Sequence, residues 1–409
     1  MTLGFVLVGG SAFVLLAAGP RLLGPAGFSG LGLVWTVSTV FGIGIAVPTE
    51  QVMIRGMNAG HSHALGGPLR ALGALGVFAA LACLVLGSRA PAAEGLSFLP
   101  WAMALSVLGW VFLAFVRGRL GGTGDLTAYG AVLVVESAGR LAMVALAVLV
   151  PGWAPVVLML GVGLPLIVAA LAGLGFRIPS ALVDADRVDG GSGAGQARSD
   201  QPAFVLIAVG LQICLNGAPL LLEWRFGGLF PAVVGAFVAA NTYFRTPTLL
   251  IGGVLTHALV ALSHAWGEGD LAGFRTARRS ALKTSLLVLI PTTLLLVAAS
   301  PVVLRLYYGG PVDLPLVVLA ALPVSTLVAT MGQVETLPLM ASGRGRVAGV
   351  LWIAGALVTS AILLSSQGVG WGIAAGLVLG PLVALVGAAL ANRRTLAARQ
   401  GTERTGVHP

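Results

Sequence analysis

The chain has 409 residues, of which 57% are hydrophobic and only 9% are charged. Soluble globular proteins carry about 25% charged residues, so this composition excludes an ordinary soluble domain and predicts a polytopic membrane protein. The formal charge is +9, but the basic residues lie in short loops between apolar runs, without the interleaved aromatic residues of a nucleic-acid surface, so we expect no nucleic-acid partner.

A helix that crosses a bilayer needs about 20 predominantly apolar residues. Twelve runs of suitable length follow one another along the chain, and we number them as spans 1 to 12. They cover residues 2–19, 27–48, 71–87, 96–116, 128–150, 154–176, 202–222, 228 to about 251, 285–304, 314–340, 347–364 and 368–391. The sequence therefore predicts an all-α fold with about twelve transmembrane helices.

Basic residues are distributed unevenly between the loops. Most of the 23 Lys and Arg residues lie in the loops that follow even-numbered spans and in the C-terminal tail. Because basic loops stay on the cytoplasmic side, both termini are predicted to be cytoplasmic. The scarcity of lysine and the abundance of alanine and glycine are typical of a GC-rich bacterium, so we expect the protein in a bacterial cytoplasmic membrane.

A polar stretch, "RIPSALVDADRVDGGSGAGQARSDQ", separates span 6 from span 7. It lacks apolar periodicity and is typical of a flexible linker. We predict an N-terminal six-helix lobe over residues 1–176, a cytoplasmic linker over 177–201, a C-terminal six-helix lobe over 202–391 and a cytoplasmic tail over 392–409. Six spans in each half favour parallel repeats related by a pseudo-twofold axis along the membrane normal.

Span 5 carries two charges near its middle, Glu136 and Arg140. Residues four apart share one helix face, so the two can form an ion pair that locks span 5 to its neighbours. Alternatively, Arg140 lines a transport cavity while Glu136 tunes it or carries a coupling proton, because ionisable residues inside a membrane are candidates for function. The two interpretations can coexist.

Span 7 contains Gln212 and Asn216 one turn apart, followed by Gly217 and Pro219. Proline supplies no N–H, so a backbone carbonyl one turn earlier loses its helical partner. The pattern predicts either a hinge or cavity-facing kink, or side chains that form hydrogen bonds between helices.

Span 8 contains "AANTYFRTPTLLIGG", in which Asn241 and Arg245 are spaced to share a helix face. Arg245 has no acidic residue nearby in the sequence, so it needs an anionic ligand or a carboxylate from another helix. The candidate carboxylates are Glu136, Glu223 and Glu335. Pro247 predicts a kink in this helix.

The segment after span 8, "DLAGFRTARRSALK", places Leu271, Phe274 and Leu282 among four basic residues. It predicts either a basic helix on the inner leaflet or a solvated basic loop.

Other features point to packing rather than chemistry. Glu335 in span 10 is a structural carboxylate or a protonation site, and the glycines of "GWGIAAGLVLG" in span 12 predict close helix packing. Cys83 and Cys214 lie inside apolar spans, so we expect packing residues, with no metal site and no cofactor. HExxH, GxSxG and Walker motifs do not occur, and the external loops are short, so we expect no enzymatic activity.

Three stretches carry a resemblance to a known family: "RLLGPAGFSGLGLVWTV" after span 1, "RGRLGGTGDLTAYGAVLVVESAGRL" entering span 5, and "GAFVAANTYFRTPTLL" in span 8. They resemble polysaccharide or O-antigen flippases of the multidrug/oligosaccharidyl-lipid/polysaccharide (MOP) exporter superfamily. The resemblance implies two six-helix lobes around a cationic cavity. It also implies flipping of lipid-diphosphate-linked oligosaccharides to the outer leaflet by alternating access, for export of surface polysaccharide.

The resemblance assigns roles by position. Glu136 and Arg140 correspond to the fifth-helix pair, and Arg245 to the eighth-helix basic residue that faces them. The candidate substrate contacts are thus Arg140, Arg245, Asn241, Asn216 and Gln212, and the coupling or ion-pair residues are Glu136 and Glu335. The implied partners are a polyprenyl-diphosphate-linked glycan, membrane lipid, a polysaccharide polymerase and glycosyltransferases.

Two other functions remain open. One is an ion-coupled exporter of small amphipathic compounds, for which an acidic cavity is expected. Drug-exporting relatives commonly hold an acidic residue in the first helix, and "TLGFVLVGGSAFVLLAAG" has none, which argues against a drug antiporter of that kind. The other is a non-transporting membrane scaffold, in which the buried charges are structural.

Overall fold

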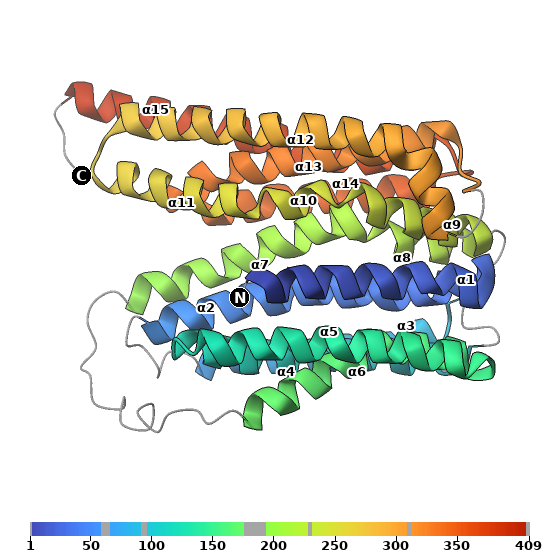
Figure 1. Ribbon diagram of the computed structural model, residues 1–409. Coiled ribbons are helices and arrows are strands. Elements are labelled where there is room, and N and C mark those ends of the chain that lie inside the picture. The colour runs from blue at the N-terminus through green and yellow to red at the C-terminus, as the bar shows by residue number, and fades with distance from the viewer. Residues whose placement is uncertain are drawn as a thin grey trace. The chain divides into compact units, whose positions relative to one another are not determined.

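The computed structural model describes residues 2–58, 66–90, 96–175, 194–227, 231–308 and 312–405. Within these ranges every regular element is a helix (Figure 1), which confirms the all-α prediction. Ten of the described helices are long and apolar enough to cross a membrane, and the bent pair Ala203–Asn216 and Ala218–Phe226 makes an eleventh. A shorter apolar helix, Ala232–Phe244, agrees with the remaining expected span. The chain is therefore built as a multi-pass membrane protein.

The first 175 residues form the helices of spans 1 to 6. They are α1 (Thr2–Phe41), the π-helix η1 (Gly42–Ala46), α2 (Val47–Asn58), α3 (Gly66–Gly87), α4 (Leu99–Gly122), α5 (Leu126–Leu149), the 3₁₀ turn η4 (Pro151–Trp153) and α6 (Ala154–Gly175). Helix α1 contains span 1 and most of span 2, with a break at Gly24, where φ is 70°. Glycine adopts this left-handed conformation without steric cost, so the chain can turn between the two spans.

Helices α4, α5 and α6 share a buried apolar core. Leu113 and Val116 of α4 pack with Val132 and Leu133 of α5 and with Leu166 of α6. Val132 lies one helical turn before Glu136 and two turns before Arg140, so all three are on the same face of α5. The core around Val132 therefore fixes the position of the charged pair.

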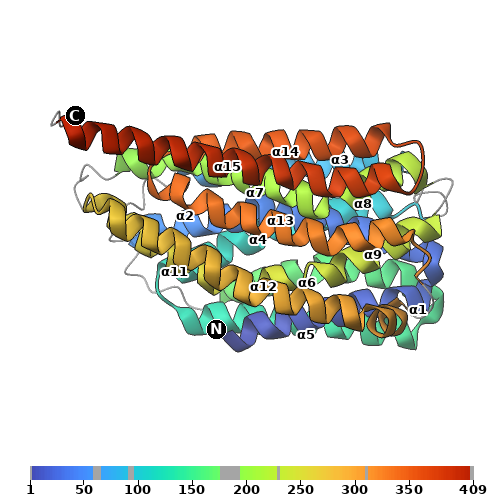
Figure 2. The same ribbon diagram turned by 90° about the horizontal axis from the view of Figure 1, so that it is seen from above.

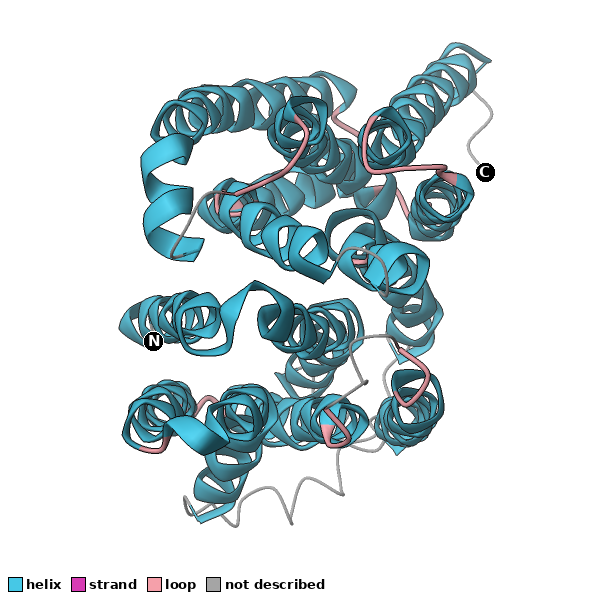
Figure 3. Ribbon diagram, turned by 90° about the vertical axis from the view of Figure 1, so that its right-hand side faces the viewer, coloured by secondary structure: helices cyan, strands magenta, loops and turns pink. Residues whose placement is uncertain are grey.

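The second half of the chain forms the helices of spans 7 to 12. They are α7 (Ala194–Asn216), α8 (Ala218–Leu222), the π-helix η7 (Glu223–Gly227), α9 (Pro231–Phe244), α10 (Pro247–Leu250), α11 (Gly252–Gly267), α12 (Leu271–Tyr308), α13 (Leu316–Ala341), α14 (Gly345–Ser365) and α15 (Trp371–Thr405). Figure 3 shows that helices connected by loops and turns make up the part of the chain that the structure describes. The predicted breaks in spans 7 and 8 are confirmed, at Gly217 and at residues 245–246.

Four helices continue beyond the apolar runs that predict them. Helix α4 extends past Val116 to Gly122, α12 begins at Leu271, and α15 continues to Thr405. Helix α7 begins at Ala194, so the prediction of a linker was wrong for residues 194–201. Hydropathy marks only the part of a helix that suits a membrane, and Ala, Arg, Gln and Leu favour helix in the polar extensions. Residues 177–193 of the predicted linker and 406–409 of the tail lie outside the described residues.

The chain forms two compact units. The first contains Met1–Gln201, Pro219–Ala239 and Leu304–Asp313, and the second contains Pro202–Ala218, Ala240–Val303 and Leu314–Pro409. Two short stretches from the second half of the chain thus belong to the first unit. The even division into two six-helix lobes stays a prediction.

Helices α14 and α15 of the second unit run side by side (Figure 2) at unusually close approach. A Cβ atom added to Gly355 of α14 would lie 2.5 Å from the carbonyl oxygen of Gly380 on α15. A Cβ added to Gly376 would lie 3.1 Å from Leu363. Small residues therefore allow the two backbones to meet, as the glycine spacing of span 12 predicts.

We expect Gly355→Ala to lower the free energy of unfolding by about 1–3 kcal/mol, because the new methyl group meets a backbone carbonyl that cannot rotate away. Thermal unfolding in detergent measures the effect. Gly10→Ala in α1 is the matched control, since a Cβ there meets nothing within 4 Å. Equal melting temperatures for the two variants would contradict the close approach.

Candidate functional site

The charged pair of span 5 lies on α5 within the first unit. Glu136 is 0% and Arg140 3% exposed. Arg140 Nη2 lies 2.5 Å from Glu136 Oε1, so the predicted ion pair is confirmed. Asp125 caps the start of the helix by accepting a hydrogen bond from the Ala128 N–H at 2.9 Å, which places the pair three turns into α5.

This pair is not saturated with hydrogen bonds. Apart from the contact between Arg140 Nη2 and Glu136 Oε1, the pair has no partner among the described residues: Glu136 Oε2 and Arg140 Nε and Nη1 are buried without a hydrogen bond. Buried polar atoms are nearly always paired, so unpaired ones mark a place for water, a ligand or a proton. The geometry thus gives the pair a capacity to bind that a purely structural salt bridge would lack.

Arg245 lies in the break between α9 and α10, rather than inside a continuous helix. Helix α9 ends at Phe244, and the Arg245 N–H still donates to the Asn241 carbonyl at 3.1 Å, so the two residues keep the predicted helical spacing up to the break. The cause of the break is Pro247, which cannot donate to the carbonyl of Tyr243. That carbonyl instead accepts from the Thr246 hydroxyl at 2.8 Å, which stabilises the turn.

The guanidinium of Arg245 is held by neutral acceptors. It donates from Nε to the Leu215 carbonyl at 3.0 Å and from Nη1 to Thr326 Oγ1 at 2.7 Å, with Ser325 Oγ at 3.4 Å. Arg245 is only 8% exposed. Among the described residues no carboxylate forms an ion pair with it, so this buried charge is uncompensated within the second unit.

The Leu215 carbonyl is available because of Pro219. In an unbroken helix the N–H of residue 219 would donate to the carbonyl of residue 215, and proline has no N–H. Helix α7 ends at Asn216, and the Arg245 side chain takes over the freed carbonyl. The arginine of span 8 thereby caps the broken helix of span 7.

Three further polar residues lie on α7 and α9. Asn216 Nδ2 donates to Gln212 Oε1 at 2.6 Å, so these two side chains bond within one helix and not between helices. Asn241 is 4% exposed, and its Oδ1 is buried without a hydrogen-bond partner. Gln212, Asn216 and Asn241 therefore belong to the same unit as Arg245, and Asn241 retains an acceptor for a ligand.

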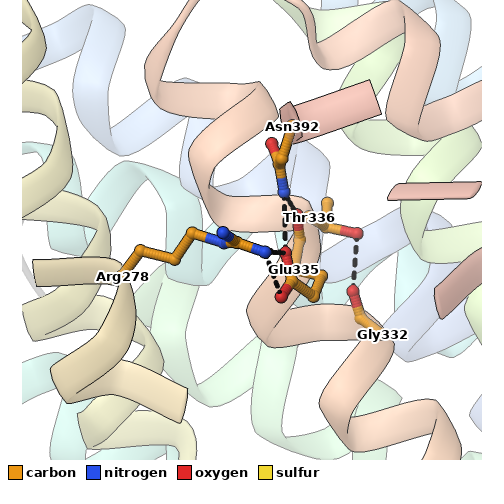
Figure 4. A network of polar contacts seen from close by, with 5 residues as sticks. All are labelled: Arg278, Gly332, Glu335, Thr336 and Asn392. Atoms are coloured by element: carbon orange, nitrogen blue, oxygen red, sulfur yellow. Dashed lines mark hydrogen bonds and ion pairs between the residues drawn. The ribbon is translucent and has the colours of Figure 1, made fainter. Parts of the chain in front are cut away.

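Glu335 belongs to a different cluster (Figure 4). Arg278 of α12 binds both of its carboxylate oxygens, with Nη2–Oε1 at 2.7 Å and Nε–Oε2 at 3.0 Å, and Asn392 of α15 donates to Oε2 at 2.8 Å. Glu335 is thus fully paired. It is not the counter-charge of Arg245, and its geometry is that of a structural clamp between α12, α13 and α15.

A third buried cluster was missed by sequence reasoning. Arg117 of α4 lies 3.3 Å from Glu50 of α2, and the Tyr129 hydroxyl of α5 donates to Glu50 at 2.6 Å. All three side chains are buried. Glu50 and Arg117 fall just beyond the apolar runs of spans 2 and 4, so hydropathy assigned them to loops.

The predicted site residues thus separate into groups. Glu136 and Arg140 belong to the first unit, whereas Arg245, Gln212, Asn216, Asn241 and Glu335 belong to the second. Arg245 approaches Leu215, next to Asn216, while Glu335 is engaged elsewhere by Arg278. The expectation that Arg245 faces the Glu136–Arg140 pair stays a prediction.

Comparison with known proteins identifies the fold. Neither a protein-family model nor a curated protein matches the sequence. Among solved structures, a multidrug resistance MATE family transporter of the MOP superfamily in an inward-facing conformation aligns over 97% of this chain and 95% of its own, with TM-score 0.74 and 17% identity. The chain has the fold of the MOP superfamily.

Other MOP structures align equally completely. The outward-facing conformation of a multidrug resistance MATE family transporter covers 97% of this chain and 94% of its own, with TM-score 0.64 and 18% identity. A MOP superfamily transporter from Pyrococcus furiosus Vc1, for which a reversed polarity of the binding pocket suggests a different function, covers 96% and 94%, with TM-score 0.65 and 19% identity. At these identities the similarity establishes the MOP fold alone.

Proposed function

We propose that this chain is an alternating-access membrane exporter that uses an ion gradient to expel small amphipathic compounds. The fold supports this proposal, because MOP transporters described as multidrug resistance proteins align with nearly the whole chain in inward-facing and outward-facing forms. Among the functions that the sequence left open, this one agrees best with the fold. A scaffold would have no use for a transporter fold along its whole length.

The observation that carries the proposal is the incompletely bonded Glu136–Arg140 pair. When Glu136 is ionised, the pair is neutral. Ionised Glu136 still offers its Oε2, which has no hydrogen-bond partner among the described residues, to a cationic group of the substrate. A proton on Glu136 removes the negative charge and releases that group. Because the proton and the substrate compete for the same carboxylate, proton entry can drive substrate export.

Proteoliposomes provide the test. We expect wild-type protein to drive export of a fluorescent amphipathic compound when a proton gradient is imposed. We expect Glu136→Gln to lose gradient-driven export, because glutamine resembles the protonated carboxyl and cannot release a proton. Glu268→Gln is the control, since Glu268 is exposed and pairs only with His264 among the described residues.

The outcome that opposes the proposal is equal export by wild type and Glu136→Gln at equal protein level. A sodium gradient is the second arm, and stimulation by sodium alone would exclude Glu136 as a proton carrier. No export of any fluorescent compound under either gradient would remove small amphipathic compounds as substrates.

A second candidate is favoured by Arg245. This buried arginine has no carboxylate partner in the described chain, and each of Glu50, Glu136 and Glu335 already contacts an arginine. An arginine that lacks a carboxylate partner suits an anionic substrate better than a cationic one, and guanidinium groups bind phosphate oxygens well. The second candidate is flipping of a lipid-diphosphate-linked oligosaccharide, with a polymerase and glycosyltransferases as partners in the bacterial cytoplasmic membrane.

The same proteoliposomes separate the two candidates. A labelled polyprenyl-diphosphate oligosaccharide placed in one leaflet reports flipping by its accessibility from the other side. Flipping without export of the fluorescent compound would establish the second candidate in place of the first.

A further inference from the structure

Helix α12 is too long for the membrane alone. Its 38 residues, Leu271–Tyr308, correspond to about 57 Å at a rise of 1.5 Å per residue. The hydrocarbon core of a bilayer is about 30 Å thick, so the helix continues through the headgroup region. The first third of α12 carries four basic residues, Arg275, Arg278, Arg279 and Lys283.

The apolar side of this segment is occupied by protein. Leu271, Phe274 and Ala281 pack in one buried cluster with Leu262 of α11 and Leu396 of α15. The apolar positions that predicted a helix lying flat on the inner leaflet therefore face other helices. The segment begins a helix that continues along span 9.

The opposite face of α12 carries a continuous exposed stripe. Arg275, Arg279 and Lys283 follow one another at intervals of four residues, so they share a face. Arg279 and Lys283 are exposed, and Arg275 is half-buried. The same face continues with Leu287 and Leu294, which are 65% and 64% exposed. The stripe thus changes from basic to apolar within one turn after Lys283.

The three basic residues have no counter-charge in the described chain. Among the neighbouring acidic groups, Glu335 binds Arg278, and Asp270 accepts from the backbone N–H of Gly273 at the start of the helix. Like charges four residues apart on a helix repel by a few tenths of a kcal/mol per pair. An anion from outside the protein would relieve this repulsion.

We propose that Arg275, Arg279 and Lys283 bind the headgroup of an anionic phospholipid in the leaflet on the predicted cytoplasmic side. The headgroup phosphate lies among the three charges, and the acyl chains lie along Leu287 and Leu294. The place of the three charges on α12 indicates a lipid as the ligand, because they lie where the exposed apolar face of the helix ends. Basic residues at that level attract anionic lipid, whereas a soluble anion would gain nothing from the apolar part of the stripe.

Lys283 allows a direct test in the wild-type chain, since it is the only lysine in the sequence. The probe is an amine-reactive reagent, with modification at Lys283 followed by peptide mass spectrometry, in nanodiscs of phosphatidylcholine with or without phosphatidylglycerol. We expect phosphatidylglycerol to slow modification by about tenfold, since each basic residue near an anionic surface contributes severalfold to binding. Unchanged modification would overturn the proposal. Equal protection by inorganic phosphate in phosphatidylcholine nanodiscs would also overturn it, because the site would then bind a free anion.

A matched pair of variants tests whether the site is local. One variant replaces Arg275, Arg279 and Lys283 with glutamine. The control replaces Arg346 of α14 and Arg393 and Arg394 of α15, which are also exposed and bear the same total charge. We expect the rise in melting temperature on adding phosphatidylglycerol to disappear only in the first variant. An equal loss in both would overturn the proposal in favour of general surface charge.

Discussion

Arg245→Met is expected to lower the free energy of unfolding by about 1–3 kcal/mol, because the Leu215 carbonyl is left buried without a donor. Leu215 is 3% exposed, so water does not replace the guanidinium easily. Thr326 is affected less, since its hydroxyl also donates to the Leu322 carbonyl. Chemical or thermal unfolding in detergent measures the loss.

The cause can be isolated by combining this change with Pro219→Ala. An alanine at position 219 restores an N–H that can donate to the Leu215 carbonyl, as in an unbroken helix. We therefore expect the double variant to be more stable than the sum of the single effects predicts, by about 1 kcal/mol. Additive effects, within about 0.5 kcal/mol, would contradict the assignment of Arg245 as the cap of span 7.

Arg245→Lys separates charge from geometry. Lysine keeps the positive charge but has no planar fork to reach the Leu215 carbonyl and Thr326 together. We expect Arg245→Lys to remain less stable than wild type. Full stability in this variant would show that the charge alone is required at this position.

Arg278→Ala is expected to lower the free energy of unfolding more than Glu335→Ala does, although the two residues form one ion pair. The side chain of Glu335 is 6% exposed and that of Arg278 is 21% exposed. Loss of Arg278 strands a buried carboxylate with only the Asn392 amide as its side-chain partner, at a cost of about 3 kcal/mol. Loss of Glu335 leaves an arginine that can reach solvent, so we expect Glu335→Ala to lower the free energy of unfolding by only about 1–2 kcal/mol.

Removing both charges tests whether the unpaired buried carboxylate causes the loss of stability in Arg278→Ala. We expect Arg278→Met with Glu335→Leu to be more stable than Arg278→Ala alone, because apolar residues of similar volume avoid the unpaired buried charge. Arg394→Ala is the control, since Arg394 is exposed and forms no ion pair with a carboxylate among the described residues. We expect it to change the free energy of unfolding by less than about 0.5 kcal/mol. A loss at Arg394 equal to that at Arg278 would mean that basic charge in general, and not this ion pair, stabilises the helices.

Some of these contacts follow from the sequence. The ion pair of Glu136 and Arg140 is expected from their separation by four residues in a helix, and the structure contains it. The breaks at Gly217 and before Pro247 follow from the missing proline N–H, and both occur. Each of these inferences concerns residues within about two helical turns, where covalent geometry alone sets the distances.

Other contacts could not be found in this way. Arg278 and Glu335 are 57 residues apart. Nothing in the sequence indicates whether Glu335 pairs with Arg278 or with Arg245. The pairing of Arg117 with Glu50 was hidden because both residues lie beyond the apolar runs that mark the spans. Hydropathy measures transfer into lipid, and it contains no information about which polar side chains meet when helices pack.

The sequence by itself determined the all-α class, the approximate number of spans, the places where helices break and the pair on span 5. These properties depend on composition, on helical period and on the absence of an N–H in proline, all of which are local. The tertiary structure alone decided that Arg245 caps the helix of span 7, that Glu335 belongs to Arg278, and that the apolar side of the basic segment faces protein. Those outcomes depend on which of several compatible donors and acceptors come together when distant helices pack, and packing is a property of the whole chain.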